Sequence, residues 1–249
     1  MAAIIAVYLG GIAVLLGAVL LFVRWRIALP LLAAGLAAGS VGLILPAPER
    51  NSPSARTRLD DLVPRYQFHE RHQVATVASC ARAYQALLNV TAGEITFFRT
   101  LTWIRRLGRP GAESILNPPA DAPLLKVATR SGFMLLANQE DREIVLGTVV
   151  LMPPGGRRPE NPDQFTTLSE PGYGKAALNF HWEPTGTGGC IVTTETRVFA
   201  TDPEARRTFG KYWRVIYPGS ALIRRMWLRA VKRRAERGEV LAPSAANGH

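Results

Sequence analysis

Two long runs without a charged side chain constrain this chain more than any other feature. Residues 2–23 and residues 27–45 are almost wholly apolar, and only Arg24, Trp25 and Arg26 separate them. As a helix the first run would rise ~33 Å, enough to cross a hydrocarbon core of about 30 Å. The sequence therefore predicts a two-helix transmembrane hairpin over residues 1–46 and a multi-pass location in the cell membrane.

Details of both runs favour a hairpin over two alternatives. A cleaved signal peptide begins with basic residues, which this N-terminus lacks, and a buried soluble hairpin would show polar faces. Trp25 between two arginines suits the membrane interface. Small residues let membrane helices approach closely, and both runs contain them: Gly10, Gly11, Gly17, Gly35, Gly39 and Gly42.

The side on which the remaining chain lies depends on arginine counts. A hairpin places the N-terminus and everything after residue 46 on one side, and positive residues near membrane helices favour the cytoplasm. The turn carries Arg24 and Arg26. The flank after the second helix carries Arg50, Arg56, Arg58 and Arg65. This count predicts a cytoplasmic domain.

The rest of the chain divides into three parts. Residues 47–64 are rich in Pro and Ser and predict an extended, exposed linker. Residues 65–238 contain the periodic patterns of a folded domain. Residues 239–249 have no core-forming pattern, which predicts a disordered tail.

Charge and cysteine content leave alternatives open. The net charge of +11 indicates contact with an anionic partner, either phospholipid headgroups or nucleic acid. Cys80 and Cys190 are expected to be two small buried hydrophobic residues, although a disulfide is possible if the domain lies outside the cytoplasm.

The domain has an α+β pattern. A curved sheet with one apolar face needs a cover, and a long amphipathic C-terminal helix can supply it. Asp202, Pro203 and Glu204 predict the start of this helix, and Pro218-Gly219 predicts a kink or two helices in tandem. The other expected elements are strands at 66–77, 133–138, 143–151, 173–182 and 191–200, and helices at 80–89, 94–107 and 123–130.

The C-terminal helix combines an apolar stripe with many basic residues. Three interpretations are a solvated face, contact with anionic lipid, and contact with nucleic acid. Nucleic acid is disfavoured because Trp213, Tyr217 and Trp227 fall on the stripe that the core needs. The expected membrane-surface residues are Arg224, Arg225, Arg229, Arg233 and Arg234, together with Arg24, Trp25 and Arg26 of the hairpin turn.

Several segments resemble bacterial members of the START-like, or SRPBCC, superfamily, which includes polyketide cyclase-like and lipid-transfer proteins. They are residues 128–133 (Ala-Thr-Arg-Ser-Gly-Phe), 142–147, 171–176, 192–198 and 212–220. The resemblance implies a helix-grip fold with an apolar cavity between the sheet and the C-terminal helix. It implies no catalytic residue and no cofactor, because the family shares no catalytic motif.

Candidate ligand-binding residues follow from this expectation. They are Asn179, His181, Glu195, Arg197, Trp213, Ile216 and Trp227. Glu195 and Arg197 share one strand face, which either lines the cavity or faces outward as an ion pair. No metal site is expected, because His69 and His72 are three residues apart on a strand and point to opposite faces.

The leading hypothesis is a membrane-tethered START-like module that binds or transfers a hydrophobic small molecule or lipid. Its expected partners are membrane lipids, with anionic headgroups meeting the basic helix. One alternative is a cyclase- or aromatase-type enzyme, which needs convergent polar groups in the cavity. Another is a structural or partner-binding membrane protein whose core is filled.

Overall fold

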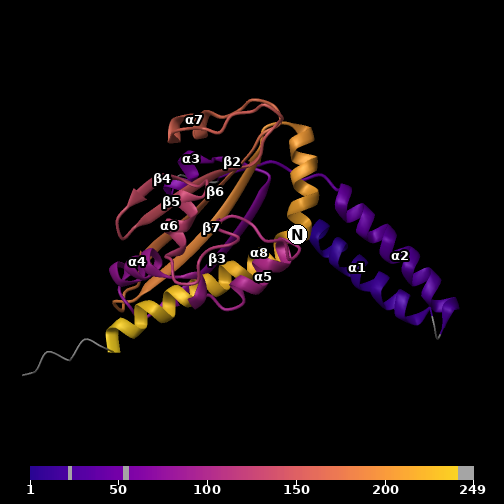
Figure 1. Ribbon diagram of the computed structural model, residues 1–249, viewed down its shortest axis with the longest axis horizontal. Coiled ribbons are helices and arrows are strands. Elements are labelled where there is room, and N and C mark those ends of the chain that lie inside the picture. The colour runs from indigo at the N-terminus through magenta and orange to yellow at the C-terminus, as the bar shows by residue number, and fades with distance from the viewer. Residues whose placement is uncertain (22–23, 53–55, 241–249) are drawn as a thin grey trace, which may run out of the picture.

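A five-stranded antiparallel sheet organises the part of the chain that follows the two N-terminal helices (Figure 1). The computed structural model describes residues 1–21, 24–52 and 56–240, with the side chains of 238–240 left aside. The strand order is β3-β7-β6-β5-β4. The strands are β3 (Phe68–Thr76), β4 (Met134–Gln139), β5 (Glu143–Leu151), β6 (Gly174–Pro184) and β7 (Cys190–Ala200).

Helix α8 (Pro203–Val240) crosses the inner face of this sheet. Asp202 caps its N-terminus by accepting hydrogen bonds from the backbone N–H of Glu204 at 2.7 Å and of Ala205 at 3.0 Å. The helix is continuous through Pro218 and bends near its middle, where it meets the hairpin (Figure 1). The α+β helix-grip fold is therefore present, and of the two expected forms of the final helix the kinked one occurs.

The remaining short elements cover both faces of the sheet (Figure 1). Helices α4, α5 and α6 lie with α8, whereas α3 and α7 lie across the opposite, outer face. Their bounds are α3 (Arg58–Leu62), α4 (Cys80–Asn89), the 3-10 helix η1 (Ala92–Glu94), α5 (Phe98–Arg105), α6 (Leu124–Arg130) and α7 (Pro162–Thr167); β1 (Arg50–Asn51) pairs with β2 (Arg65–Tyr66).

The core is divided by the sheet because side chains alternate along each strand. On the inner face Leu178, Phe180 and Trp182 of β6 join the main core with Trp227 of α8. On the outer face Val145 of β5 belongs to a second cluster, built with residues of α3, α7, β6 and β7.

Helices α1 (Ala2–Leu20) and α2 (Trp25–Ile44) form the N-terminal hairpin. A Cβ atom added at Gly10 would lie 2.6 Å from the carbonyl oxygen of Gly35, so this glycine permits the close approach of the helices. Both helices are long and apolar enough to cross a membrane, and only 11% and 17% of their most apolar windows are buried. Most of their apolar surface is thus exposed, unlike that of a core helix.

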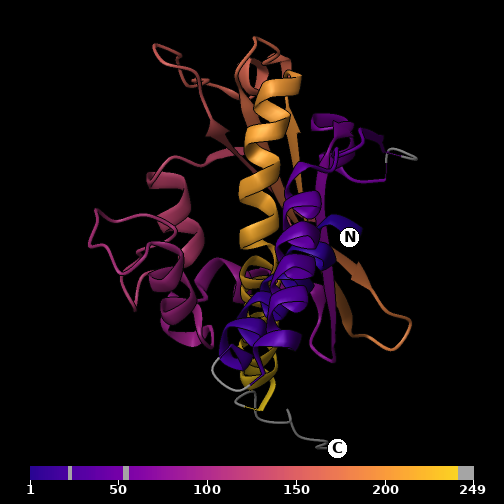
Figure 2. The same cartoon turned by 90° about the vertical axis from the view of Figure 1, so that its right-hand side faces the viewer.

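The hairpin docks on the first half of α8, next to its bend (Figure 2). Arg214 of α8 is buried and donates a hydrogen bond from Nη1 to the carbonyl oxygen of Leu43 at 2.8 Å, and another from Nη2 to that of Leu45. Ile4 of α1 packs against the cluster that contains Trp213. The end of the hairpin that bears Arg24 is the end far from the domain (Figure 1).

The segment expected to be an exposed linker is partly folded. Leu59, Asp60 and Val63 are buried, and α3 begins with a capping box between Thr57 and Asp60. Its apolar residues fill the second core cluster on the outer face of the sheet. The sequence did not predict this helix, because it is only five residues long and lies in a segment rich in Pro and Ser.

The helix expected over residues 94–107 is shorter than predicted. A capping box between Thr91 and Glu94 begins η1 instead. Phe97 then adopts a left-handed backbone conformation, with φ at 60°, so α5 starts only at Phe98. Of the expected tail, residues 239–240 belong to α8, and residues 241–249 lie outside the described residues.

Cys80 and Cys190 form a disulfide, which corrects the expectation of two separate buried thiols. Cys80 begins α4 and Cys190 begins β7, and their Cα atoms are 5.1 Å apart. The bond closes a chain segment of 110 residues.

Candidate functional site

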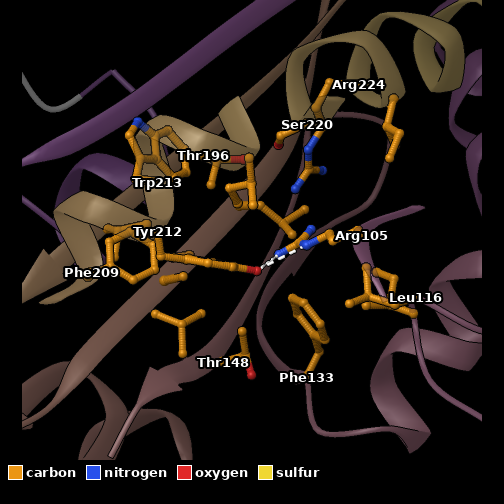
Figure 3. A pocket seen from close by; sticks show the side chains of 18 of the residues that line it. Arg105, Leu116, Phe133, Thr148, Thr196, Phe209, Tyr212, Trp213, Ser220 and Arg224 are labelled. Carbon is orange, nitrogen blue, oxygen red and sulfur yellow. Dashed lines mark hydrogen bonds between the residues drawn. The ribbon is translucent and has the colours of Figure 1, made fainter. Parts of the chain in front are cut away.

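A cavity of about 430 Å³ lies between the inner face of the sheet and helices α5 and α8 (Figure 3). This volume falls within the range of about 300–1,000 Å³ that is typical of small-molecule sites. Two short side chains of the sheet, Ala176 and Thr196, line this space opposite the helices.

Most of the cavity wall is apolar. Aromatic side chains come from three elements: α5, the segment before β4, and α8. The apolar lining comprises Phe98, Ile115, Leu116, Phe133, Val149, Val150, Leu151, Ala176, Ala177, Leu178, Val198, Phe209, Trp213, Ile216, Ile223 and Trp227.

The polar lining consists of hydroxyl groups and two guanidinium groups. Thr102, Thr148, Thr196, Thr208, Ser220 and Tyr212 supply the hydroxyls, and Arg105 and Arg224 supply the charge. Arg105 of α5 donates from Nε to the Tyr212 hydroxyl of α8 at 3.0 Å, and also from Nη2 (Figure 3). This contact joins the two helices across the exposed edge of the cavity.

Arg224 is enclosed more deeply than Arg105. Its guanidinium lies 5.6 Å from the centroid of the Trp227 ring, and its buried Nη1 has no hydrogen-bond partner among the described residues. Burial lowers the pKa of Arg224; the carboxylate of Glu70 opposes this effect, and the charge of Arg105 adds to it.

Glu70 is the acidic side chain that influences Arg224, but its oxygens are engaged elsewhere. Oε1 lies 2.7 Å from Nε2 of His72, and Oε2 accepts a hydrogen bond from Ser220 at 3.0 Å. Neither Arg105 nor Arg224 has a carboxylate oxygen within 4.0 Å among the described residues. Both charges therefore lack a direct ion-pair partner.

The sequence-predicted candidates separate into two groups. Trp213, Ile216 and Trp227 line the cavity. The expectation that the polar candidates line it is not met, because alternation along β6 and β7 turns their side chains to the outer face. These residues are Asn179, His181, Glu195 and Arg197.

On the outer face Arg197 is the centre of a buried ionic network. Its Nη2 lies 2.7 Å from Asp60 Oδ1 and its Nε lies 2.6 Å from Glu195 Oε1. Burial alone would raise the pKa of Asp60, but hydrogen bonds from Ser52, Arg197 and backbone N–H groups hold it well below its usual range. Burial likewise acts against a lowered pKa at Glu195, and contacts with His69 and Arg197 outweigh it.

Glu143 and Asn179 extend this network to α3. Asn179 Nδ2 donates to Glu143 Oε1 at 2.7 Å, and Glu143 Oε2 accepts from the backbone N–H of Arg58 at 2.6 Å. Glu143 is buried although it begins strand β5. His181 lies beside this network, 3.7 Å from Glu183. These contacts tie α3 to the sheet.

Sequence reasoning missed Arg105 and Tyr212 and placed Arg224 on the membrane surface. Arg224 falls one position after Ile223 of the apolar stripe and three before Trp227, and it lines the cavity with both. Its place beside the stripe is the only sequence signal for this position.

The other four predicted membrane-surface residues of α8 lie beyond the cavity. Arg234 pairs with Glu94 at 2.8 Å, and Arg233 donates to the carbonyl oxygen of Glu94. Arg225 donates to Nδ1 of His72 at 3.4 Å, whereas Arg229 is exposed. This end of α8 points away from the hairpin (Figure 1).

Nothing in the described part of the chain gathers three His, Cys, Asp or Glu side chains in a position to hold a metal ion. His72 is instead close to Glu70, and His69 lies 3.2 Å from Glu195.

Comparisons with known proteins give only distant likenesses. No family model and no curated protein matches the chain. Among solved structures, MLL2253 from Mesorhizobium loti is 14% identical with a TM-score of 0.32, covering 68% of this chain and 98% of that chain. TTHA0849 from Thermus thermophilus is 10% identical with a TM-score of 0.28, covering 69% and 99%. Ara h 8.0201 is 8% identical with a TM-score of 0.21, covering 68% and 98%.

Proposed function

We propose that this chain is a membrane-tethered, START-like module of the SRPBCC type that binds or transfers a hydrophobic small molecule or lipid. The observation that carries the proposal is the cavity of about 430 Å³, lined mainly by apolar and aromatic side chains. An enclosed apolar surface with a few polar groups is the usual form of a small-molecule site. A tether to the bilayer would keep such a site at high effective concentration near lipid ligands.

Helix α5 supports access to the cavity from the bilayer. Phe98 and Thr102 on one side of α5 line the cavity. Trp103 and Ile104 on its other side, and Leu107 just after it, are 56%, 54% and 78% exposed. Exposed apolar groups of this size beside basic residues suit the membrane interface. In this proposal α5 and the bend of α8 contact the lipid and its anionic headgroups.

Only part of the predicted basic surface fits this arrangement. Arg225, Arg229, Arg233 and Arg234 lie on the half of α8 that leads away from the hairpin (Figure 1). Arg99 and Arg109, next to the exposed apolar groups of α5, are better placed for headgroups. Arg24, Trp25 and Arg26 remain proposed contacts for the opposite membrane surface.

The disulfide favours a different side of the membrane from the one that the arginine count suggested. Disulfides persist in oxidising compartments and are rare in the cytosol. With the domain outside the cytoplasm, Arg24 and Arg26 of the short turn would be inside, as the positive-inside rule prefers. We therefore favour an extracytoplasmic domain. A green fluorescent protein fused after His249 should stay dark if exported by the general secretory route; bright fluorescence would contradict this side.

The two alternatives, a cyclase-type enzyme and a structural protein with a filled core, have less support than the binding function. The side chains that an enzyme of the cyclase type was expected to use, such as Glu195 and Arg197, are bound to each other on the outer face. A structural protein with a filled core would not leave the observed cavity.

A cavity-filling substitution tests the proposal. Thr196→Trp places an indole in the cavity, and Thr187→Trp places the same group in the exposed turn between β6 and β7. Full-length protein should co-purify with an apolar molecule near one-to-one by native mass spectrometry. Thr196→Trp should lose that molecule and Thr187→Trp should keep it. An empty wild-type protein that also takes up no lipid would refute the proposed function.

A further inference from the structure

The two arginines of the cavity are unusual for an apolar site. A guanidinium in an enclosed space loses hydration and needs hydrogen-bond acceptors in return. Among the described residues, the guanidinium of Arg105 donates only to the hydroxyl of Tyr212, and the buried Nη1 of Arg224 has no hydrogen-bond partner. The cavity therefore contains unused donor capacity as well as unbalanced positive charge.

The charges around these arginines do not balance them. The cavity lining contains Arg105 and Arg224 and no Asp or Glu among the described residues. Glu70, behind Ser220, already accepts from Ser220 and contacts His72, so it acts on Arg224 only at a distance. An entering anion would meet two positive groups and no competing carboxylate in the wall.

The two guanidiniums also lie at one side of the cavity. Figure 3 shows Arg105 and Arg224 on the same side, with Phe209 and Trp213 on the other. Arg105 is exposed and Arg224 is more enclosed, so the charged region leads from the edge of the cavity inward. The aromatic and aliphatic wall occupies the remaining space.

We infer that the cavity selects an anionic amphiphile, with the acidic head bound by Arg224 and Arg105 and the apolar body packed against Trp213 and Phe209. The inference rests on the proposed function and narrows its ligand class. Carboxylate and phosphate both match the forked donors of arginine, so a fatty acid and a lipid phosphate share the required chemistry. Tyr212, whose hydroxyl accepts from Arg105, can donate its own proton to the same head.

A purely structural role for Arg224 makes a different prediction. In that role Arg224 would pack on Trp227 without any ligand, and removing it would lower the affinity for all apolar ligands equally. If Arg224 binds an anion, removing it would lower the affinity for acidic ligands selectively.

The test uses three probes with one 18-carbon chain: oleate, oleyl phosphate and oleyl alcohol. Binding is measured on the full-length protein in detergent micelles by displacement of a neutral fluorescent alkyl probe. The wild type should bind one or both acids at least about tenfold more tightly than the alcohol, since hydrogen bonds to a charged group in an enclosed site are strong. The better acid identifies a carboxylate or a phosphate source.

Substitutions assign the preference to the two arginines. Arg224→Gln should reduce acid affinity about tenfold or more and leave the alcohol within twofold, whereas Arg224→Lys should keep part of the preference. Arg105→Gln should act in the same direction more weakly because it is exposed. Arg229→Gln, an exposed arginine of the same helix, should change nothing.

The outcomes separate the inference from the proposed function. Equal affinity for acids and alcohol, or equal losses for all probes in Arg224→Gln, would overturn the anion site and leave an apolar binding cavity. No binding of any probe would overturn both.

Discussion

At the scale of single residues, the face of a strand decides which side chains can meet a ligand. Along β6 nearly every residue is buried, because α8 covers one face and α3 and α7 cover the other. The sequence of β6 therefore alternates in polarity, but this alternation does not tell which face of the strand lies toward α8. Asn179 and Arg197 could be assigned to neither face from the sequence, whereas Trp213 and Trp227 followed from the helical stripe alone.

Arg197 is expected to be the most costly charge to remove. Arg197→Met leaves Asp60 buried without its cation and should lower the free energy of unfolding by about 3–5 kcal/mol. Arg71→Met, which removes an exposed arginine 3.9 Å from Glu195, should change it by less than about 0.5 kcal/mol. Urea unfolding followed by circular dichroism measures both, and similar small losses would show that the network is not stabilising.

Asp60 should make stability sensitive to acid. Its folded-state pKa lies well below the unfolded value of about 3.9, so its contribution is complete above that value and is lost as pH falls toward the folded pKa. The free energy of unfolding should therefore drop below about pH 4. Asp60→Asn should start lower at pH 7 and show a shallower fall between pH 5 and pH 3. An identical slope in the variant would assign the acid sensitivity to other groups.

At the scale of elements, the structure confirms several boundaries expected from the sequence. Helix α4 begins at Cys80, and there the hydroxyl of Ser79 accepts from the backbone N–H of Arg82 at 3.4 Å. Strand β5 begins at Glu143. By contrast, α3 is too short to show periodicity. The shortened α5 depends on the left-handed backbone of Phe97, a residue whose type does not favour that conformation.

The disulfide between α4 and β7 should contribute substantially to stability. Closing a loop of about 100 residues restricts the unfolded chain, and typical bridges contribute about 2–4 kcal/mol. The double variant Cys80→Ala, Cys190→Ala should lose about this amount in urea unfolding. A reducing agent should weaken the wild type to a similar degree and leave the double variant unchanged. A wild type insensitive to a reductant under unfolding conditions would contradict the bridge.

Helix α5 should control entry of ligand rather than its affinity. Trp103→Ala combined with Leu107→Ala removes exposed apolar surface near the cavity. Uptake of oleyl probes from vesicles by protein in nanodiscs should slow several-fold, with equilibrium affinity nearly unchanged. The matched control is Val77→Ala, 71% exposed at the turn between β3 and α4. Equal rates in all three proteins would remove α5 from the entry route.

At the scale of the whole molecule, the hairpin and the domain are joined at the bend of α8. Arg214 binds the last carbonyl groups of α2 at the place where Phe209 and Trp213 line the cavity. The two long apolar runs predicted the hairpin. The strand-rich middle of the chain and its final amphipathic helix predicted the α+β fold. Their relative placement could not be predicted, because it depends on one buried arginine and on where a helix bends. That placement brings the cavity to the end of the hairpin that carries the domain.

The most direct test of the binding function is photolabelling of the full-length protein in lipid bilayers with an alkyl chain that carries a diazirine. Peptide mapping should find label on the cavity segments of α8 and β7 as well as on the apolar hairpin, and Thr196→Trp should abolish only the cavity label. Label confined to the hairpin in the wild type would contradict a lipid-binding cavity.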